Sequence, residues 1–218
     1  MRRWNDWDRA APLTGVAFTV LVAAGAVLAG STPADNASGQ AVVAFYVKNS
    51  GRERAAVVFL AFAFIALVCF ASALRVYFRR RASHDGLTLT ALAGAVLLAA
   101  GQTITSGLVW TLAARPGQLA PATAQALNVA QNDLVITSAA GWFIFSVITG
   151  IAILQSKALP GWLGWASIVI GIVAVTPAEF AAFLAFAVWT VIVGLLTWRR
   201  STAIGTAEEQ LSDPVLAR

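Results

Sequence analysis

The stretch AAVVFLAFAFIALVCFASALRVYFRRR, residues 55–81, decides the fold class of this chain. It contains no charged side chain before Arg75, and it ends in a cluster of arginines. A helix needs roughly 20 predominantly apolar residues to cross the ~30 Å hydrocarbon core of a bilayer. Because basic residues accumulate where a span leaves the membrane, the stretch predicts a transmembrane helix that ends at a membrane surface.

The rest of the chain has the same character. Of the 218 residues, 59% are hydrophobic and only 11% are charged, whereas roughly 25% of the residues in an ordinary soluble domain are charged. The apolar blocks are too continuous for a transmembrane barrel, whose strands alternate in polarity over about 10 residues. We therefore predict an all-α fold, a polytopic transmembrane helical bundle whose surroundings are the lipid bilayer.

Six spans are predicted within a single transmembrane domain over residues 1–200. The last two are separated at Thr-Pro-Ala-Glu, residues 176–179, which matches a capping box with proline at the first helical position. Residues 201–218 are rich in small polar and acidic residues, so this tail is expected to be disordered and cytoplasmic. The predicted spans cover residues 12–30, 55–78, 87–112, 134–154, 162–176 and 178–198.

The distribution of basic residues predicts the orientation of the bundle, because lysine and arginine near span ends stay on the cytoplasmic side. An inner N-terminus puts eleven of these residues on inner segments and four on outer ones. Both termini are therefore expected in the cytoplasm, and the protein in the plasma (inner) membrane. This topology also explains the pI of about 10.3. We predict no nucleic-acid partner, because such binding needs a contiguous basic surface.

The densest basic cluster follows the second span. Its main interpretation is a stop-transfer signal that fixes topology. Its alternative interpretation is a contact with anionic lipid head groups at the cytoplasmic face. The cluster consists of Arg75, Arg79, Arg80 and Arg81.

Two long connections are predicted on the outer side. In the first, the apolar stretch AVVAFYV, residues 41–47, is expected to form a short interfacial helix with Tyr46 and Lys48 on its wet side. In the second, residues 121–132 contain good helix formers. We expect them to lead directly into the fourth span.

A polar layer interrupts the third span at GQTITSGLVW, residues 101–110. Gln102 and Ser106 are four residues apart and share a helix face. If the third and fourth spans form a hairpin, Thr137 and Ser138 lie at a similar depth. The layer then has room for interhelical hydrogen bonds, with neighbouring glycines allowing the backbones to approach closely.

This polar layer has two interpretations. In the first, its side chains join helices, at about 0.6 kcal/mol for each interhelical hydrogen bond. In the second, they line a small cavity that opens to the outer side, because polar residues inside membranes are often functional. The candidate residues for such a cavity are Gln102, Thr105, Ser106, Asp133, Thr137 and Glu179.

The sequence lacks the motifs of enzyme chemistry. It has a single cysteine, Cys69, and a single histidine, His84, so one chain cannot assemble paired haem ligands or a His/Cys metal cage. It also contains no phosphate loop, HExxH motif or nucleophile elbow. No ionisable residue falls at the centre of a predicted span, where ion-coupled pumps carry them. We predict a protein that is not an enzyme and has no cofactor.

Four stretches resemble those of an uncharacterised family of six-span integral membrane proteins from actinobacterial-type bacteria. They carry composition rather than catalytic motifs. The resemblance implies a six-helix integral membrane fold and no particular activity. The stretches are AVVAFYVKNSGRER (41–54), RVYFRRR (75–81), ALPGWLGW (158–165) and WTVIVGLLTWRR (189–200).

The leading functional prediction is an accessory, regulatory or scaffolding component of the plasma membrane. Its partner would be a helical membrane protein or a second copy of this chain, docked on the small residues Gly164, Ser167 and Gly171. The alternative is a small carrier or efflux protein for a neutral or amphipathic solute. A cavity between the third, fourth and sixth spans would favour the carrier, whereas an exposed face of small residues would favour the partner.

Overall fold

The computed structural model describes residues 10–81 and 85–212, and every regular element in these ranges is helical. The all-α prediction is therefore confirmed. By length and composition, five helices in these ranges can cross a membrane, and α7 is a shorter apolar helix. The elements are η1 (Ala11–Leu13), α2 (Thr14–Ala29), α3 (Gly39–Arg79), α4 (Asp85–Ala114), α5 (Pro121–Asp133), α6 (Val135–Ser156), α7 (Gly161–Val173) and α8 (Glu179–Ser212).

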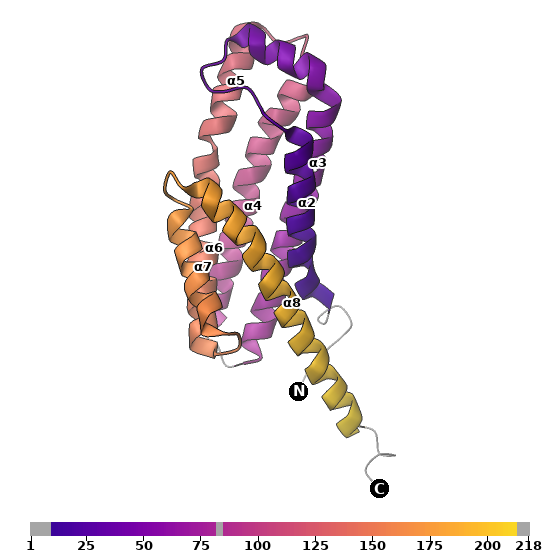
Figure 1. Cartoon of the computed structure of the whole chain (residues 1–218), viewed down its shortest axis with the longest axis vertical. Coiled ribbons are helices and arrows are strands. Elements are labelled where there is room, and N and C mark those ends of the chain that lie inside the picture. The colour runs from indigo at the N-terminus through magenta and orange to yellow at the C-terminus, as the bar shows by residue number, and fades with distance from the viewer. Residues whose placement is uncertain (1–9, 82–84, 213–218) are drawn as a thin grey trace.

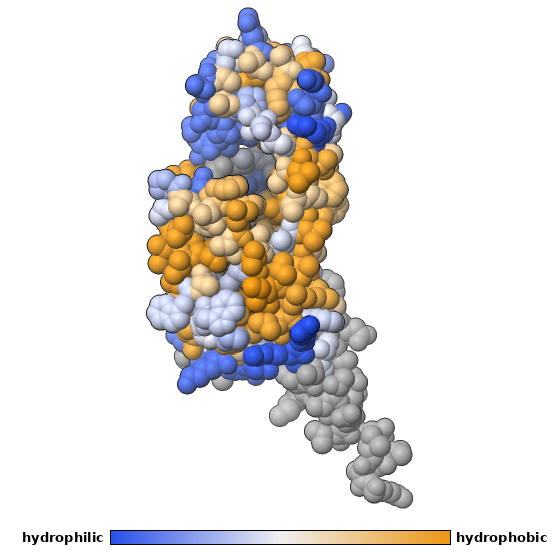
Figure 2. Space-filling model, viewed as in Figure 1, coloured by the Kyte–Doolittle hydropathy of each residue, from blue (hydrophilic) through white to orange (hydrophobic). Residues whose placement is uncertain are grey.

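The long helices form an antiparallel bundle in which α2, α3, α4 and α6 pack successively side by side. α7 packs on α6, and α8 crosses the bundle obliquely to contact both α7 and α2 (Figure 1). α2 begins and α8 ends at the same end of the bundle. Figure 2 shows a broad apolar belt between two hydrophilic ends, as expected for helices surrounded by lipid tails.

Part of the bundle extends beyond this belt. α3 has 41 residues and is about 60 Å long, twice the thickness of the hydrocarbon core. Its first turns cross the end of the bundle and pack against α5 and the last turns of α4 (Figure 1). We call this unit, residues 39–54, 107–114 and 121–133, the cap. It has a hydrophobic core of its own, formed by Val42, Tyr46, Leu112, Ala113 and Ala124.

The cap corrects the expectation of a separate interfacial helix at residues 41–47. This segment is the beginning of α3, and α5 covers its apolar face. Tyr46 is only 1% exposed and therefore does not mark a wet side, whereas Lys48 is exposed as expected. The expected continuation of residues 121–132 into the fourth span is confirmed, because α5 and α6 are separated by Leu134 alone.

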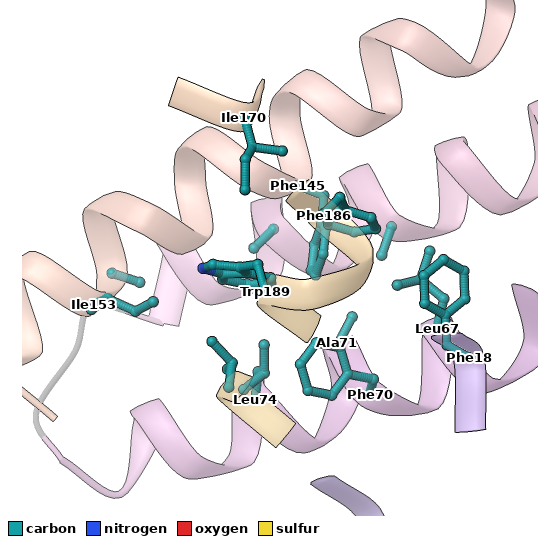
Figure 3. Packing of buried hydrophobic residues seen from close by; sticks show 14 of the residues in the cluster. Phe18, Leu67, Phe70, Ala71, Leu74, Phe145, Ile153, Ile170, Phe186 and Trp189 are labelled. Atoms are coloured by element: carbon teal, nitrogen blue, oxygen red, sulfur yellow. The ribbon is translucent and has the colours of Figure 1, made fainter. Parts of the chain in front are cut away.

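An aromatic cluster fixes α8 against the rest of the bundle. Phe186 and Trp189 stack with ring centroids 6.0 Å apart, and Phe145 of α6 contacts both rings edge-on. Figure 3 shows these side chains at the centre of the core, with Phe18 from α2 and Phe70 from α3 beside them. The buried indole of Trp189 donates a hydrogen bond to the carbonyl oxygen of Leu163 at 3.0 Å, so α8 is also tied to α7.

Small residues set the spacing between α6 and its neighbours. A side chain at Gly101 of α4 would approach the backbone of Ser138 to 2.9 Å, so these helices touch through their backbones. On the other side of α6, Gly164 is buried against Gly150. Ser167 donates a hydrogen bond to the carbonyl oxygen of Ser146 at 2.7 Å.

The small-residue face of α7 is therefore buried inside this chain and is not free for a partner helix. Gly164, Ser167 and Gly171 are all buried against α6. The idea that these small residues form an exposed face, which would have favoured a partner helix, was wrong. Its residues are small because two helices of the same chain must approach closely.

The start and end of α8 differ from the sequence expectations. The Glu179 N–H donates to the carbonyl oxygen of Thr176 at 3.1 Å, whereas the Thr176 hydroxyl accepts from the Ala178 N–H. The predicted capping box is therefore not formed, and Pro177 precedes the helix. At the other end, α8 continues to Ser212. The expected disordered tail is thus helical from residue 201 to residue 212, and residues 213–218 lie outside the described part of the chain.

Candidate functional site

The predicted meeting of the third and fourth spans is present between α4 and α6. The Gln102 amide Nε2 donates a hydrogen bond to the Ser138 Oγ at 2.9 Å. Gly101 lies next to Gln102 and lets the two helices approach at this level. The Gln102 amide is therefore carried by α4 and fixed in position by a hydrogen bond to α6.

The other candidate residues for a polar cavity are not gathered around Gln102. Thr105 donates to the carbonyl oxygen of Gly101 in its own helix at 3.2 Å, and Thr137 donates to that of Leu134, which precedes α6, at 2.6 Å. Ser106 is half-buried, whereas Asp133 and Glu179 are exposed at the end of α5 and the start of α8. Of the six predicted residues, Gln102 alone lines a pocket that lies between the helices at this level.

A pocket of about 220 Å³ lies between α2, α3, α4, α6 and α8. For scale, an engineered apolar cavity of about 150 Å³ holds one benzene molecule. Figure 2 shows the surface hollowed between the cap and the start of α8. The pocket is lined by Phe18, Val22, Gly25, Ala26, Ala29, Leu60, Phe64, Leu98, Gln102, Trp142, Phe183 and Phe186.

The pocket wall is apolar and in large part aromatic. Trp142 contacts Phe183 and Phe186 with ring centroids 6.3 and 5.5 Å apart, so these rings support one another. The side wall from α2 consists of Phe18 and of small or β-branched residues. None of the lining residues is ionisable, and Gln102 is the one lining residue with a carboxamide. Such a wall accommodates an apolar molecule and offers it one hydrogen-bonding group.

The pocket lies where α2 and α8 separate. Further along these helices, the Thr19 hydroxyl lies 2.9 Å from the Thr190 hydroxyl and donates to the carbonyl oxygen of Ala187 at 3.0 Å. Gly194 also faces the backbone of Pro12 closely. These contacts hold α2 and α8 together toward the end of the bundle where α2 begins. Toward the cap, the pocket occupies the space between them.

A second buried polar group lies in the cap, and sequence reasoning missed it. Glu53 is only 1% exposed, and its Oε1 has no hydrogen-bond partner among the described residues. The buried Tyr46 hydroxyl, two turns earlier on α3, also has none. Burial raises the pKa of Glu53, opposed by the nearby Arg52 charge. Burial and then the Glu53 charge raise the pKa of Tyr46 to about 12.

The phase of α3 is the signal that identifies Glu53. The buried face of this helix includes Tyr46, Ala56, Ala63 and Leu67, and counting back along it in steps of three or four places Glu53 on the same face. Sequence reasoning assigned residue 53 to an outer connection because charged neighbours surround it. The face on which Glu53 lies can be inferred only when α3 is known to be one continuous helix through this residue.

The candidate lipid-binding arginines are partly engaged within the chain. Arg75 and Arg79 both contact the Asp85 carboxylate, at 3.2 and 3.3 Å. The Arg81 guanidinium lies 4.9 Å from the centre of the Tyr77 ring, and Arg80 is exposed. The arginines of this cluster are therefore held both by Asp85 of α4 and by Tyr77 of their own helix, α3.

The fold and this pocket define the class of protein: an all-α bundle whose apolar helices fit a membrane-embedded protein, with a mainly apolar pocket between helices. Within the described residues, no group of three or more His, Cys, Asp or Glu side chains is placed to hold a metal ion. No known protein family, curated protein or solved structure matches the chain significantly. The resemblance to an actinobacterial six-span family therefore stays a prediction.

Proposed function

We propose that this protein is a non-enzymatic integral membrane protein that binds a small neutral amphipathic molecule from the bilayer, as a carrier would. The observation that carries this proposal is the pocket between α2 and α8. Its volume of about 220 Å³ corresponds to roughly nine carbon atoms, scaled from the benzene cavity. A short alkyl chain or a small ring system has this size.

The lining favours a neutral molecule. No ionisable side chain is present in the wall, and an unpaired charge moved from water into such a site loses its hydration without compensation. The aromatic rings of Trp142, Phe183 and Phe186 instead favour an apolar body. A molecule with a charged group would have to leave that group outside the pocket.

The position of the pocket favours entry from the lipid phase. It lies between two helices whose outer faces are apolar, as shown by the exposed side chains Val20 and Val27 of α2 and Phe180 and Leu184 of α8. Lipid tails cover such faces in a membrane. An amphipathic molecule dissolved in the bilayer therefore reaches the pocket without crossing water.

We place the cap on the outer side of the plasma membrane and both chain ends in the cytoplasm, because the basic residues accumulate at the opposite end from the cap. The proposed carrier would then load from the outer half of the bilayer. An accessory or scaffolding role remains a prediction, but the small residues of α7 no longer support it because they are buried within the chain.

The proposal is tested by filling the pocket. Ala26 lines it and Ala23, also on α2, does not, so Ala26→Phe is expected to block binding and Ala23→Phe is the matched control. The measurement is photolabelling in lipid nanodiscs by a nine-carbon alcohol that carries a diazirine, with labelled peptides mapped by mass spectrometry. We expect saturable labelling of α2 and α8 that is lost only in Ala26→Phe. Equal labelling of both variants would refute the proposed pocket.

A further inference from the structure

The ligand class follows from the only carboxamide in the pocket, so this inference rests on the proposed function. We propose that Gln102 selects a neutral molecule with a hydroxyl group, with the hydroxyl bound to the Gln102 amide and the apolar chain directed toward Phe18 and Phe186. The amide lies in the wall of the pocket. The other nitrogen-bearing side chain there, Trp142, has its Nε1 fully buried and without a partner among the described residues, so a ligand reaches this donor only if the indole moves.

Gln102 has bonding capacity left for a ligand. A carboxamide offers two N–H donors and one oxygen acceptor, and one donor is used by Ser138 Oγ at 2.9 Å. This bond also holds the amide in place between α4 and α6. One N–H and the carbonyl oxygen therefore remain on a positioned group that faces an apolar space, where an unmade hydrogen bond is costly.

A hydroxyl group matches this remaining pair. A hydroxyl both donates and accepts, so a single ligand oxygen can donate to the Gln102 oxygen and accept from its free N–H. An ether or a carbonyl only accepts, and an ammonium group only donates and carries a charge that the wall does not compensate. A neutral alcohol is thus the ligand class that uses both sides of the amide.

The orientation of such a ligand agrees with its orientation in a bilayer. Gln102 is one turn closer to the cap than Leu98 along α4, and Phe18 is the lining residue of α2 farthest from the cap. The hydroxyl would therefore lie toward the membrane surface and the chain toward the midplane. An alcohol dissolved among lipids already has this orientation, so it enters between α2 and α8 without turning over.

The test compares three competitors with the same nine-carbon chain against the photoreactive alcohol on the wild-type protein in nanodiscs. They are 1-nonanol, its methyl ether and nonane, each at the same mole fraction in the lipid. The ether keeps an acceptor and loses the donor. We expect 1-nonanol to compete about fivefold better than the ether, the ratio for one net hydrogen bond, and better still than nonane, which makes neither bond.

Two variants test whether the Gln102 amide causes the preference for the alcohol. Gln102→Met keeps the length of the side chain without its polar atoms and is expected to remove the preference. Ser138→Ala keeps the amide and removes the hydrogen bond that positions it, so it is expected to weaken the preference for the alcohol without weakening displacement by nonane. This variant tests the role of the amide if Gln102→Met does not fold.

The outcomes separate the two proposals. If all three competitors displace the probe equally from the wild-type protein, the selection of a hydroxyl is wrong and the pocket still binds apolar molecules. If none displaces it, the proposed function itself fails. A fivefold preference that persists in Gln102→Met would assign the selection to another residue and overturn this inference.

Discussion

Replacing Glu53 by glutamine is expected to stabilise the protein at neutral pH. The Glu53 carboxyl is buried in the cap, and its Oε1 has no partner among the described residues. Leaving a buried polar group unpaired costs about 1–3 kcal/mol, and more for a charged group. Glu53→Gln has nearly the same shape and removes the charge. We expect the free energy of unfolding to rise by about 1 kcal/mol or more, which for a chain of this size raises the Tm by at least roughly 2–4 °C.

The raised pKa of Glu53 determines how the stabilisation by Glu53→Gln changes with pH. Burial raises the pKa of Glu53 in the folded protein above the ordinary value of 4.5, so the folded state holds this proton more tightly than the unfolded state. The corresponding stability is complete below pH 4.5 and is lost as the pH rises through the raised pKa. The advantage of Glu53→Gln should therefore vanish at about pH 4 and reach its full size at high pH.

The assay is thermal unfolding in detergent between pH 4 and pH 8, followed by tryptophan fluorescence. The exposed residue Glu179 supplies the control, because Glu179→Gln removes an equivalent charge outside the cap and should leave the Tm unchanged. A Tm that falls in Glu53→Gln at every pH would show that the ionised carboxylate has a stabilising partner, and the reasoning would then be refuted.

Further substitutions test the packing, the cap and the basic end. Gly141→Val should lower the free energy of unfolding by about 1–3 kcal/mol, because a side chain there would overlap the backbone of α4. Gly107→Ala is the control and should not lower it, because Gly107 faces open space. Thermal unfolding measures both variants. Tyr46→Phe should not lower the Tm, because the hydroxyl that it removes has no partner. Trp189→Phe should cost about 1 kcal/mol in the same assay, since it removes the buried hydrogen bond from the indole to the Leu163 carbonyl oxygen. Asp85→Asn releases two arginines from a shared carboxylate and should increase the amount of anionic lipid that co-purifies with the protein. Unchanged lipid content would favour the stop-transfer interpretation.

The helices that form this bundle could be predicted because each carries its own signal. The apolar run of α3 begins after Arg54 and ends at Arg75 with no charge between, and hydrocarbon thickness alone turns such a run into a span. The contact between Gln102 and Ser138 could be predicted from hairpin geometry, since a hairpin of the third and fourth spans places both residues at a similar depth. Local composition and short connections were sufficient for these features.

The cap could not be predicted in the same way, because its burial depends on another helix. Tyr46 has the composition of an interfacial residue, and only the packing of α5 on α3 makes it part of a core. Charged neighbours such as Arg52 are exposed, whereas Glu53 is turned inward by the phase of a helix that extends well past the membrane. Composition predicts where a segment lies relative to lipid. It does not predict which face a second segment will cover.

The pocket has its origin in the length of α7. With 13 residues, this helix is about 20 Å long, so the turn that follows it lies well below the cap (Figure 1). α8 therefore begins at Glu179, part of the way down the bundle, and crosses obliquely toward the far end. It meets α2 closely only from about Phe186 onward, and the upper part of α2 is left without a covering helix. The break at residues 174–178, which the sequence shows only as a turn, thus determines that the bundle contains a space open toward lipid.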